Sequence, residues 1–344
     1  MRTIDAQERP ILPSATQKRT KTRIVILMLL SIGTMINYLD RTILGVVAPK
    51  LTSEIDIDPA MMGIVFSAFA WTYALAQIPG GMFLDRFGNK LTYALSIFFW
   101  STFTLLQSFS VGLKSLLLLR LGLGISEAPC FPVNSRVVSK WFPQHERARA
   151  TATYTVGEYI GLAAFSPLLF LILEHHGWRT LFFLTGGLGI AFTFVWWKFY
   201  HEPHESKTAN KEELEYIGVE NTTSVNENIP FNWHDAKRLL CCRQIIGASL
   251  GQFAGNTTLV FFLTWFPTYL ANERHLPWLH VGFFASWPFL AAAIGIFFGG
   301  WVSDKIIKKT NSVNISRKLP IISGLLLSSC IIIANWVDSN TAVI

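Results

Sequence analysis

Charged residues are scarce in this sequence. Aspartate, glutamate, lysine and arginine make up 15% of the 344 residues, whereas hydrophobic residues make up 51%. The apolar residues gather in repeated runs of about 20, the length at which an α-helix crosses a bilayer. This pattern excludes an ordinary soluble domain and a disordered chain. We therefore predict an all-α polytopic membrane protein.

Cysteine is also rare, and the motifs of common enzymes are missing. The four cysteines, Cys130, Cys241, Cys242 and Cys330, have neither the spacing of metal ligands nor the pattern of a disulfide framework. The sequence has no phosphate-binding loop and no Ser/His/Asp arrangement with supporting context. The first 23 residues are polar and basic and lack the apolar core of a signal peptide. We expect no enzymatic activity, no metal, and a tail that stays in the cytoplasm.

Nine apolar spans follow one another along the chain. They cover about residues 24–47, 60–84, 91–111, 115–138, 150–173, 181–199, 245–270, 281–302 and 319–336. A polar stretch separates the sixth span from the seventh, and we expect a short helix within it at Lys211–Ile217. The predicted regions are a cytoplasmic tail (1–23), a six-helix bundle (24–199), a cytoplasmic linker (200–243) and a partial second bundle of about three helices (244–344).

Lysine and arginine are distributed unequally between the two sides of these spans. The tail, the linker and the loops on their side hold most of them, whereas the opposite loops hold only Lys50, Lys114, Arg179 and Arg274. The positive-inside rule therefore places the N-terminus in the cytoplasm. The net charge of +7 is explained by this basic face, so we expect no nucleic-acid partner.

The first span contains a polar group of residues in its second half. Asn37, Tyr38, Asp40 and Arg41 are followed by further apolar residues up to residue 47, so the charges fall inside one membrane-length segment. A charge at the centre of a spanning helix costs about 2.5–3.5 kcal/mol on insertion scales. Asp40 and Arg41 either neutralise each other at the membrane edge or face a polar cavity that handles a charged solute.

Two turns of the sequence repeat each other. Residues 80–90 read Gly-Gly-Met-Phe-Leu-Asp-Arg-Phe-Gly-Asn-Lys after the second span, and residues 299–309 read Gly-Gly-Trp-Val-Ser-Asp-Lys-Ile-Ile-Lys-Lys after the eighth. Aligned in this way, spans seven to nine repeat spans one to three. Parallel repeats of six spans are a transporter architecture.

The turn at 80–90 resembles the Gly-x-x-x-Asp-Arg-x-Gly-x-Lys loop between the second and third helices of the major facilitator superfamily. Residues 37–41 (Asn-Tyr-Leu-Asp-Arg), 120–129 (Arg-Leu-Gly-Leu-Gly-Ile-Ser-Glu-Ala-Pro) and 140–149 (Lys-Trp-Phe-Pro-Gln-His-Glu-Arg-Ala-Arg) are similar to its anion:cation symporter branch. Residues 264–269 (Thr-Trp-Phe-Pro-Thr-Tyr) in the seventh span agree with the same branch. The resemblance extends over the whole chain and implies two six-helix bundles, so we expect the nine spans to be part of a longer chain of twelve.

The resemblance also assigns roles to charged residues. It implies that Asp40 and Glu127 bind protons and that Arg41 clamps the carboxylate of the substrate, while Arg120 pairs with one of the acids in the empty carrier. Arg120 and Glu127 are seven residues apart and share a helix face. Burial favours a neutral carboxyl group and a nearby guanidinium favours the charged one, so the two influences can balance as proton coupling requires. The alternative is a static ion-pair cluster that only joins two helices.

Several uncharged or isolated polar residues complete the predicted site. Tyr38 and Tyr73 are candidates for hydroxyl contacts with the substrate, or else packed rings. Glu158 occupies a position where members that carry sugar acids commonly have Gln, and it either adds a titrating group or selects a different polar end of the substrate. Gln252 and Asn256 are one turn apart and either line the opposite wall or form hydrogen bonds between helices.

The repeated turns supply a predicted cytoplasmic gate. Asp85 and Arg86 and their counterparts Asp304 and Lys305 would join helix ends when the carrier opens outward and separate when it opens inward. The alternative is a solvated charged loop.

The resemblance implies a proton-coupled symporter of small organic anions, of which hexonates, hexuronates and aldarates are typical. The expected setting is a bacterial inner membrane, with a multi-pass, monomeric carrier whose coupling ion is the proton. A proton-independent uniporter or anion exchanger, and a membrane receptor on the same scaffold, remain alternatives.

Overall fold

The computed structural model describes residues 18–218, 233–310 and 312–331, although the side chains at 235, 236, 278, 279, 304, 308, 313 and 317 are not described. Every regular element within these ranges is a helix, as predicted. The elements are α1 (Thr22–Ile55), α2 (Pro59–Gln107), α3 (Leu113–Glu127), α4 (Cys130–Trp141), α5 (Gln144–Phe199), η1 (Pro203–Glu205), α6 (Lys211–Ile217), α8 (Trp233–Leu240), α9 (Arg243–Thr264), α10 (Phe266–Asn272), α11 (Trp278–Thr310) and α12 (Val313–Ser328).

Two of the elements each contain two of the predicted spans. α2 is interrupted at Gly88 (φ 75°, ψ 176°) and α5 at Gly177 (φ 77°, ψ 172°). This backbone region is open almost only to glycine because a Cβ atom would clash there. The chain reverses direction at each glycine, so the two long elements are helical hairpins with very tight turns. The short predicted loops after the second and fifth spans are therefore reduced to single residues.

Other spans are divided where proline removes a backbone donor. The fourth span consists of α3 and α4, which are separated by Ala128 and Pro129. The seventh consists of α9 and α10, and Pro267 lies in the first turn of α10. Within the described ranges, six helices are long and apolar enough to cross a membrane, with α2 and α5 counted once each and α3 with α4 as one. The last residues of the ninth predicted span, 332–336, lie outside the described residues.

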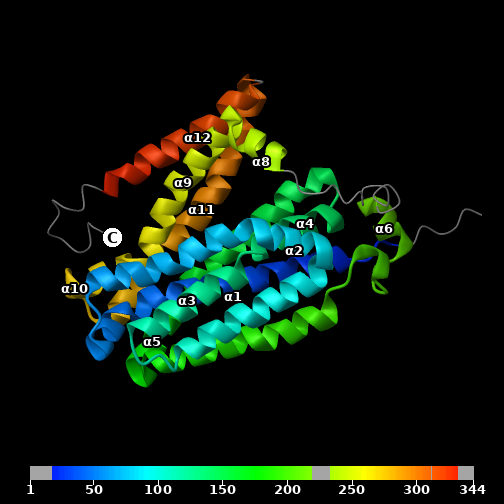
Figure 1. The fold of residues 1–344 in the computed structure, drawn as a ribbon. Helices are drawn as coiled ribbons and strands as arrows, with labels where there is room; N and C mark the ends of the chain where they lie inside the picture. The colour runs from blue at the N-terminus through cyan, green and yellow to red at the C-terminus, as the bar shows by residue number, and fades with distance from the viewer. Residues whose placement is uncertain (1–17, 219–232, 311, 332–344) are drawn as a thin grey trace, which may run out of the picture.

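Helices α1–α5 form an N-terminal half with its own core (Figure 1). We call the end that holds Thr22, Gly88 and Trp141 the tail end, and the end that holds Ile55 and Gly177 the far end. Near the tail end a buried apolar cluster fills the interior, with Ile26, Leu30, Ile36, Leu84, Tyr93, Ile97, Trp100, Trp141 and Trp196 among its members. This cluster separates the middle of the N-terminal half from the tail end.

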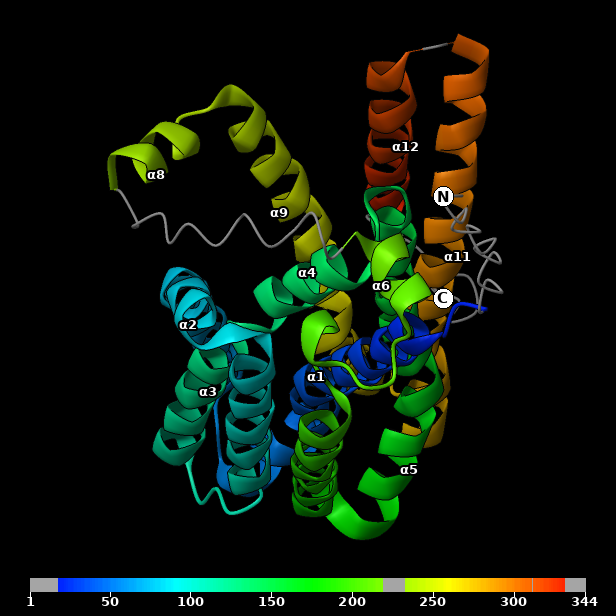
Figure 2. The ribbon, with the colours of Figure 1, turned by 90° about the vertical axis from the view of Figure 1, so that its right-hand side faces the viewer.

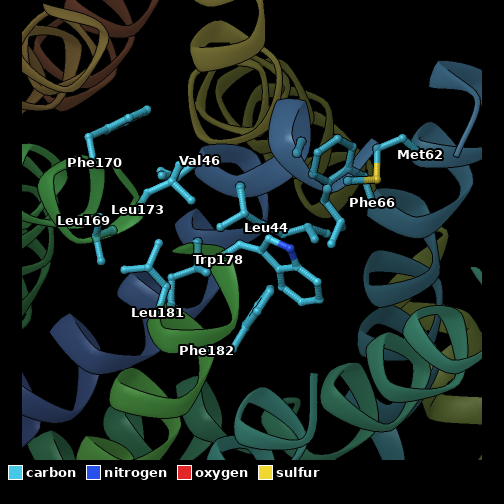
Figure 3. Packing of buried hydrophobic residues seen from close by; sticks show 14 of the residues in the cluster. Leu44, Val46, Met62, Phe66, Leu169, Phe170, Leu173, Trp178, Leu181 and Phe182 are labelled. Carbon is cyan, nitrogen blue, oxygen red and sulfur yellow. The ribbon is translucent and has the colours of Figure 1, made fainter. Parts of the chain in front are cut away.

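The C-terminal half (α9–α12) contacts the N-terminal half at the far end. There Phe266, Leu270 and Val281 join a cluster built from α1, α2 and α5. Figure 3 shows Trp178 of this cluster pointing toward Leu44. Most of α9 is exposed on its tail-end side, and α9 and α11 leave the bundle beside α10 (Figure 1). The two halves therefore meet at one end and diverge toward the other.

The short helix α6 lies against the start of α1 (Figure 2). The buried Glu213 carboxylate accepts hydrogen bonds from the backbone N–H groups of Thr22 and Arg23, each at 3.2 Å, and from the Thr20 hydroxyl at 2.5 Å. An acidic group at a helix N-terminus satisfies free N–H groups and the helix dipole together. Arg23 in turn pairs with Glu146 at 3.1 Å. The helix that we predicted at Lys211–Ile217 is confirmed, and it is fastened to the N-terminal half.

Candidate binding and proton-coupling site

The face of α3 that points into the N-terminal half has a charged residue at each end and a glycine between them. Arg120, Gly124 and Glu127 are spaced by four and three residues, so they lie on one side of the helix. A Cβ atom on Gly124 would collide with the carbonyl oxygen of Phe69 and with the Thr72 hydroxyl. Because glycine allows this close approach of α2 and α3, the side chains of α2 come within reach of both charges.

Arg41 of α1 and Glu127 of α3 form a buried ion pair. The Nε and Nη2 atoms of Arg41 both approach Oε1 of Glu127, with Nε at 2.5 Å. The Glu127 side chain has no exposed surface, whereas 17% of the Arg41 side chain is exposed. A buried pair of this kind holds two helices together, and the loss of one partner leaves an uncompensated charge.

Aromatic rings surround the Arg41 guanidinium. Its Cζ atom lies 4.9 Å from the ring centroid of Tyr73, 5.0 Å from Tyr38, 5.1 Å from Phe69 and 5.9 Å from Phe131. The faces of such rings carry partial negative charge and attract cations. Four helices therefore contribute to the arginine site, and both predicted tyrosines belong to it.

Arg120 lies at the edge of this site and makes a different contact from the one that we predicted. Its Cζ atom is 5.1 Å from the Phe69 ring, and its Nε and Nη1 atoms have no hydrogen-bond partner among the described residues. The predicted pairing with an acid is made by Arg41 instead. Arg120 is nevertheless buried and close enough to Glu127 to interact electrostatically with it.

Asp40 lies about 100° around α1 from Arg41, so it faces other neighbours. It is 1% exposed, and its neighbours are Trp100 and Thr104 of α2 and Thr185 of α5. Neither carboxylate oxygen has a hydrogen-bond partner within the described part of the chain. Asp40 is close enough to Glu127 for the two acids to influence each other's charge. The two predicted proton-binding residues thus lie in different environments inside the same half.

Glu158 of α5 lies beside the Tyr38 hydroxyl. It is 3% exposed, and the Tyr38 ring belongs to a small cluster that includes Leu263 of α9 and Phe289 of α11. Glu158 therefore lies next to the place where the two halves meet. Its carboxyl group is the third acid within the charged cluster of the N-terminal half.

The structure does not bring the two predicted residues of α9 into this cluster. Gln252 and Asn256 are exposed, and their side chains contact each other at 3.5 Å. They lie on the part of α9 that has diverged from the N-terminal half.

The predicted gate residues whose side chains the structure describes contact other partners. Asp85 pairs with Arg136 of α4 at 2.8 Å, and Arg86 lies over the Phe87 ring at 5.5 Å. Lys305 lies over the Trp301 ring at 4.8 Å. The Asp304 side chain is outside the described residues. Their role as a gate stays a prediction.

Sequence reasoning missed two residues that build the site, Phe69 and Phe131, which line the arginine site. Asn37, which belongs to the polar group noted in the first span, is a neighbour of Glu127. Phe69 is one turn before Tyr73, and Phe131 is one turn after Glu127, so helical spacing could have indicated both. No group of His, Cys, Asp and Glu in the described ranges could hold a metal ion. The chemistry of the site is therefore that of carboxylates, guanidiniums and aromatic rings.

Comparison with known proteins gives a family and several relatives. The family described as Major Facilitator Superfamily matches residues 30–344. A D-galactonate transporter of Escherichia coli O6:H1 is 45% identical over 95% of this chain and 77% of its own length. A probable galactarate/D-glucarate transporter of Escherichia coli K12 is 41% identical over 96% of this chain and 77% of its own. A hexuronate transporter of Bacillus subtilis is 31% identical, with 91% and 72% covered.

Solved structures share the fold. A bacterial homologue of the human lysosomal transporter Spinster superimposes with a TM-score of 0.65 at 23% identity, over 84% of this chain and 64% of that chain. The xylose transporter XylE of Escherichia coli gives a TM-score of 0.58 at 13% identity, over 83% and 70%.

Proposed function

Because this chain belongs to the major facilitator superfamily, in its anion:cation symporter branch, we propose that it carries a sugar acid across a membrane together with protons. The observation that supports this proposal is the buried ion pair of Arg41 and Glu127 inside a ring of aromatic side chains. A guanidinium that is surrounded by rings and held by one movable acid suits the reversible binding of a carboxylate.

The ion pair suggests how binding of the anion and the proton are linked. The substrate carboxylate and Glu127 compete for the same guanidinium, and Arg41 is the partly exposed member of the pair. Protonation of Glu127 removes its negative charge and weakens its hold on Arg41, so the substrate takes its place. Loss of the proton restores the pair and releases the substrate. Substrate and proton therefore bind together and leave together.

Asp40 is the second proton-binding group in this proposal. The Asp40 side chain is buried, and a buried charge costs more free energy than a buried neutral group. Protonation of Asp40 therefore changes the free energy of packing α1 against α2 and α5. This change is communicated to Glu127 by the electrostatic interaction of the two acids.

The arrangement of the two halves corresponds to one stage of alternating access. The halves touch at the far end, and α9 is exposed toward the tail end. The distribution of lysine and arginine assigns the tail end to the cytoplasm. We therefore assign this conformation as inward-facing, with the far-end cluster as the closed outer gate.

The proposed substrate class rests on the names of the relatives, which are a D-galactonate transporter, a probable galactarate/D-glucarate transporter and a hexuronate transporter. The named substrates are all polyhydroxylated carboxylates. The bacterial relatives also support a multi-pass protein of a bacterial inner membrane.

The test is uptake of radiolabelled D-galactonate and D-glucarate by liposomes that contain the protein. An imposed pH gradient, acidic outside, should drive accumulation by the unmodified protein. Asp40→Asn and Glu127→Gln should abolish accumulation while counterflow of preloaded substrate persists. Unchanged gradient-driven accumulation in both variants would refute proton coupling through these acids and leave a uniporter or exchanger. Binding without any movement of substrate would leave a receptor.

A further inference from the structure

The third predicted span, in the second part of α2, has a row of polar residues on its buried side. Trp100, Ser101, Thr104, Gln107 and Ser110 are each exposed by 1% or less. Trp100, Thr104 and Gln107 recur every three or four residues and Ser101 follows Trp100 directly, so these four lie on one side of α2, while Ser110 lies in the loop just after the helix ends at Gln107. Polar side chains are seldom buried in such a row inside an apolar bundle.

Several polar atoms of this row have no hydrogen-bond partner among the described residues, whereas Nε2 of Gln107 donates to the Phe103 carbonyl oxygen at 3.4 Å, and Trp100 and Thr104 face the Asp40 carboxyl group. The Trp100 indole N–H, the hydroxyls of Ser101, Thr104 and Ser110, and Oε1 of Gln107 have no hydrogen-bond partner among the described residues. Buried polar groups are nearly always hydrogen-bonded, and water supplies the missing partner when a site is polar. Hydroxyl groups both donate and accept, which a chain of proton transfers requires.

The row has an acid at one end and exposed charges at the other. Trp100 and Thr104 are neighbours of the Asp40 carboxyl group. At the far end, Nη2 of Arg179 donates to the Ser110 carbonyl oxygen at 3.3 Å, and Arg179 lies 3.7 Å from Glu54. The side chains of Arg179 and Glu54 are about half exposed. Gln107 lies about one turn beyond Thr104, at the end of α2, and Ser110 lies in the loop that follows.

On the tail-end side of Asp40 large buried side chains fill the interior, and the buried Asn134 amide donates to the Thr34 hydroxyl there at 3.2 Å. Ile36 of α1 and Tyr93 and Ile97 of α2 are buried in the cluster that fills the tail-end side of the N-terminal half. The charged groups near Asp40 are Glu127 and Arg120, both on α3. From α2 and α5 it is faced by the Trp100 indole and the hydroxyls of Thr104 and Thr185.

We infer that this row is a proton path that connects Asp40 with the far end of the N-terminal half, separately from the arginine site where the substrate binds. The inference rests on the proposed proton coupling. It adds the route that protons take to Asp40 and the end of the molecule from which they enter. Protons enter near Glu54, pass Ser110, Gln107 and Thr104 through bridging water, and reach Asp40 while the substrate enters between the two halves.

The alternative is a static cage of hydroxyl groups that only fixes the Asp40 side chain. Gln107 and Ser110 separate the two possibilities, because Gln107 lies about one turn beyond Thr104 and Ser110 lies in the loop after α2, farther along the chain than Trp100 and Thr104, which face Asp40. The test variants are therefore Gln107→Leu and Ser110→Ala, with Thr104→Val. Thr102→Val is the matched control, since its hydroxyl donates to the Phe98 carbonyl oxygen and lies about 200° around the helix from Thr104.

The measurement is D-galactonate uptake by liposomes under an imposed pH gradient, beside counterflow without a gradient. Gln107→Leu and Thr104→Val should slow gradient-driven uptake by about tenfold while counterflow stays within about twofold. Ser110→Ala should slow it less, because water can replace its hydroxyl near the surface. Thr102→Val should behave like the unmodified protein.

The outcomes distinguish this inference from the proposed function. If Asp40→Asn keeps gradient-driven uptake, proton coupling through Asp40 is wrong and the path is wrong with it. If Asp40→Asn loses that uptake but Gln107→Leu keeps the full rate, the coupling stands and the path is refuted. Equal loss of gradient-driven uptake and counterflow in Gln107→Leu would also refute it, because a blocked proton path spares exchange.

Discussion

At the scale of a single residue, Arg41 has two alternative binding partners in the proposed mechanism. In that mechanism it holds Glu127 when the substrate is absent and a substrate carboxylate when the substrate is present. A planar guanidinium suits both partners, because it offers donors in a fork and stacks on rings. The aromatic side chains keep it in place while its acidic partner changes.

Replacing this arginine by lysine tests the geometry apart from the charge. Arg41→Lys keeps the positive charge but loses the forked donors and most of the contact with the rings at about 5 Å. We expect the half-saturating concentration of D-galactonate to rise about tenfold or more, since a charge-assisted hydrogen bond contributes about 1.5–3 kcal/mol. Initial uptake rates over a range of concentrations provide the measurement. An unchanged half-saturating concentration would remove Arg41 from substrate binding.

Glu158 is expected to select between substrates with one and two carboxylates. An acidic group beside Tyr38 repels a second carboxylate at that end of the site whenever it is ionised, and it accepts hydrogen bonds from hydroxyl groups. Glu158→Gln should therefore raise uptake of D-glucarate relative to D-galactonate by several-fold. Competition between the two labelled substrates measures the ratio. Glu158→Asp, which keeps the acidic group, should leave it low.

The residues of the site were more predictable than their contacts. Asp40, Arg41, Arg120 and Glu127 stand out because charges are rare in spanning segments. Which arginine pairs with Glu127 depends on how α1 and α3 are rotated about their axes, and the sequence spacing within one helix does not determine that.

At the scale of helices, glycine decides how closely α2 and α5 pack. A Cβ atom on Gly186 would lie 2.5 Å from the Leu105 backbone nitrogen and 2.7 Å from the Ser101 carbonyl oxygen. The neighbouring Gly187 has no atom within 4 Å of such a Cβ. The two glycines are adjacent in sequence but meet different surroundings.

This difference gives a matched pair of variants. Gly186→Ala should separate the second part of α2 from α5 and lower the unfolding temperature in detergent by several degrees, because backbone atoms cannot move aside. Gly187→Ala should raise it slightly or leave it unchanged, since alanine is the better helix former by about 1 kcal/mol. Thermal unfolding followed by fluorescence compares them. A lower unfolding temperature for Gly187→Ala than for Gly186→Ala would contradict the packing described here.

Helices were predictable from the sequence because each apolar span is long and well separated from the next. The hairpins at Gly88 and Gly177 were expected only as short loops, since the hydropathy pattern does not reveal that one residue suffices to reverse the chain. α8 was not expected, because its polar composition resembles that of the linker around it.

At the scale of the whole molecule, the proposed far-end gate includes a close backbone approach between the halves at Gly45. A Cβ atom on Gly45 would collide with the Leu263 carbonyl oxygen and lie 3.0 Å from the Thr264 Cα atom. Gly63, also near the far end, would meet only the Trp265 ring at 3.8 Å. Gly45 is therefore suited to closing this end, and a larger side chain there would hold it open.

Gly45→Val should thus shift the population from the inward-facing toward the outward-facing conformation. Distances between spin labels on the far-end tips of α1 and α11 should lengthen, and counterflow should slow at least tenfold because every cycle requires closure of this gate. Gly63→Ala is the control and should change neither. If Gly45→Val leaves the distances unchanged, the far-end contact is not the gate.

The attachment of α6 to the start of α1 has a consequence for how the polypeptide can be divided. Glu213 holds the backbone of Thr22 and Arg23, and the Tyr216 hydroxyl donates to Glu146 at 2.7 Å, so the first part of the linker belongs structurally to the N-terminal half. Two separately expressed fragments should assemble into a working carrier when the division falls after Gly218. A division before Asn210 would remove the cap of α1 from the fragment that needs it.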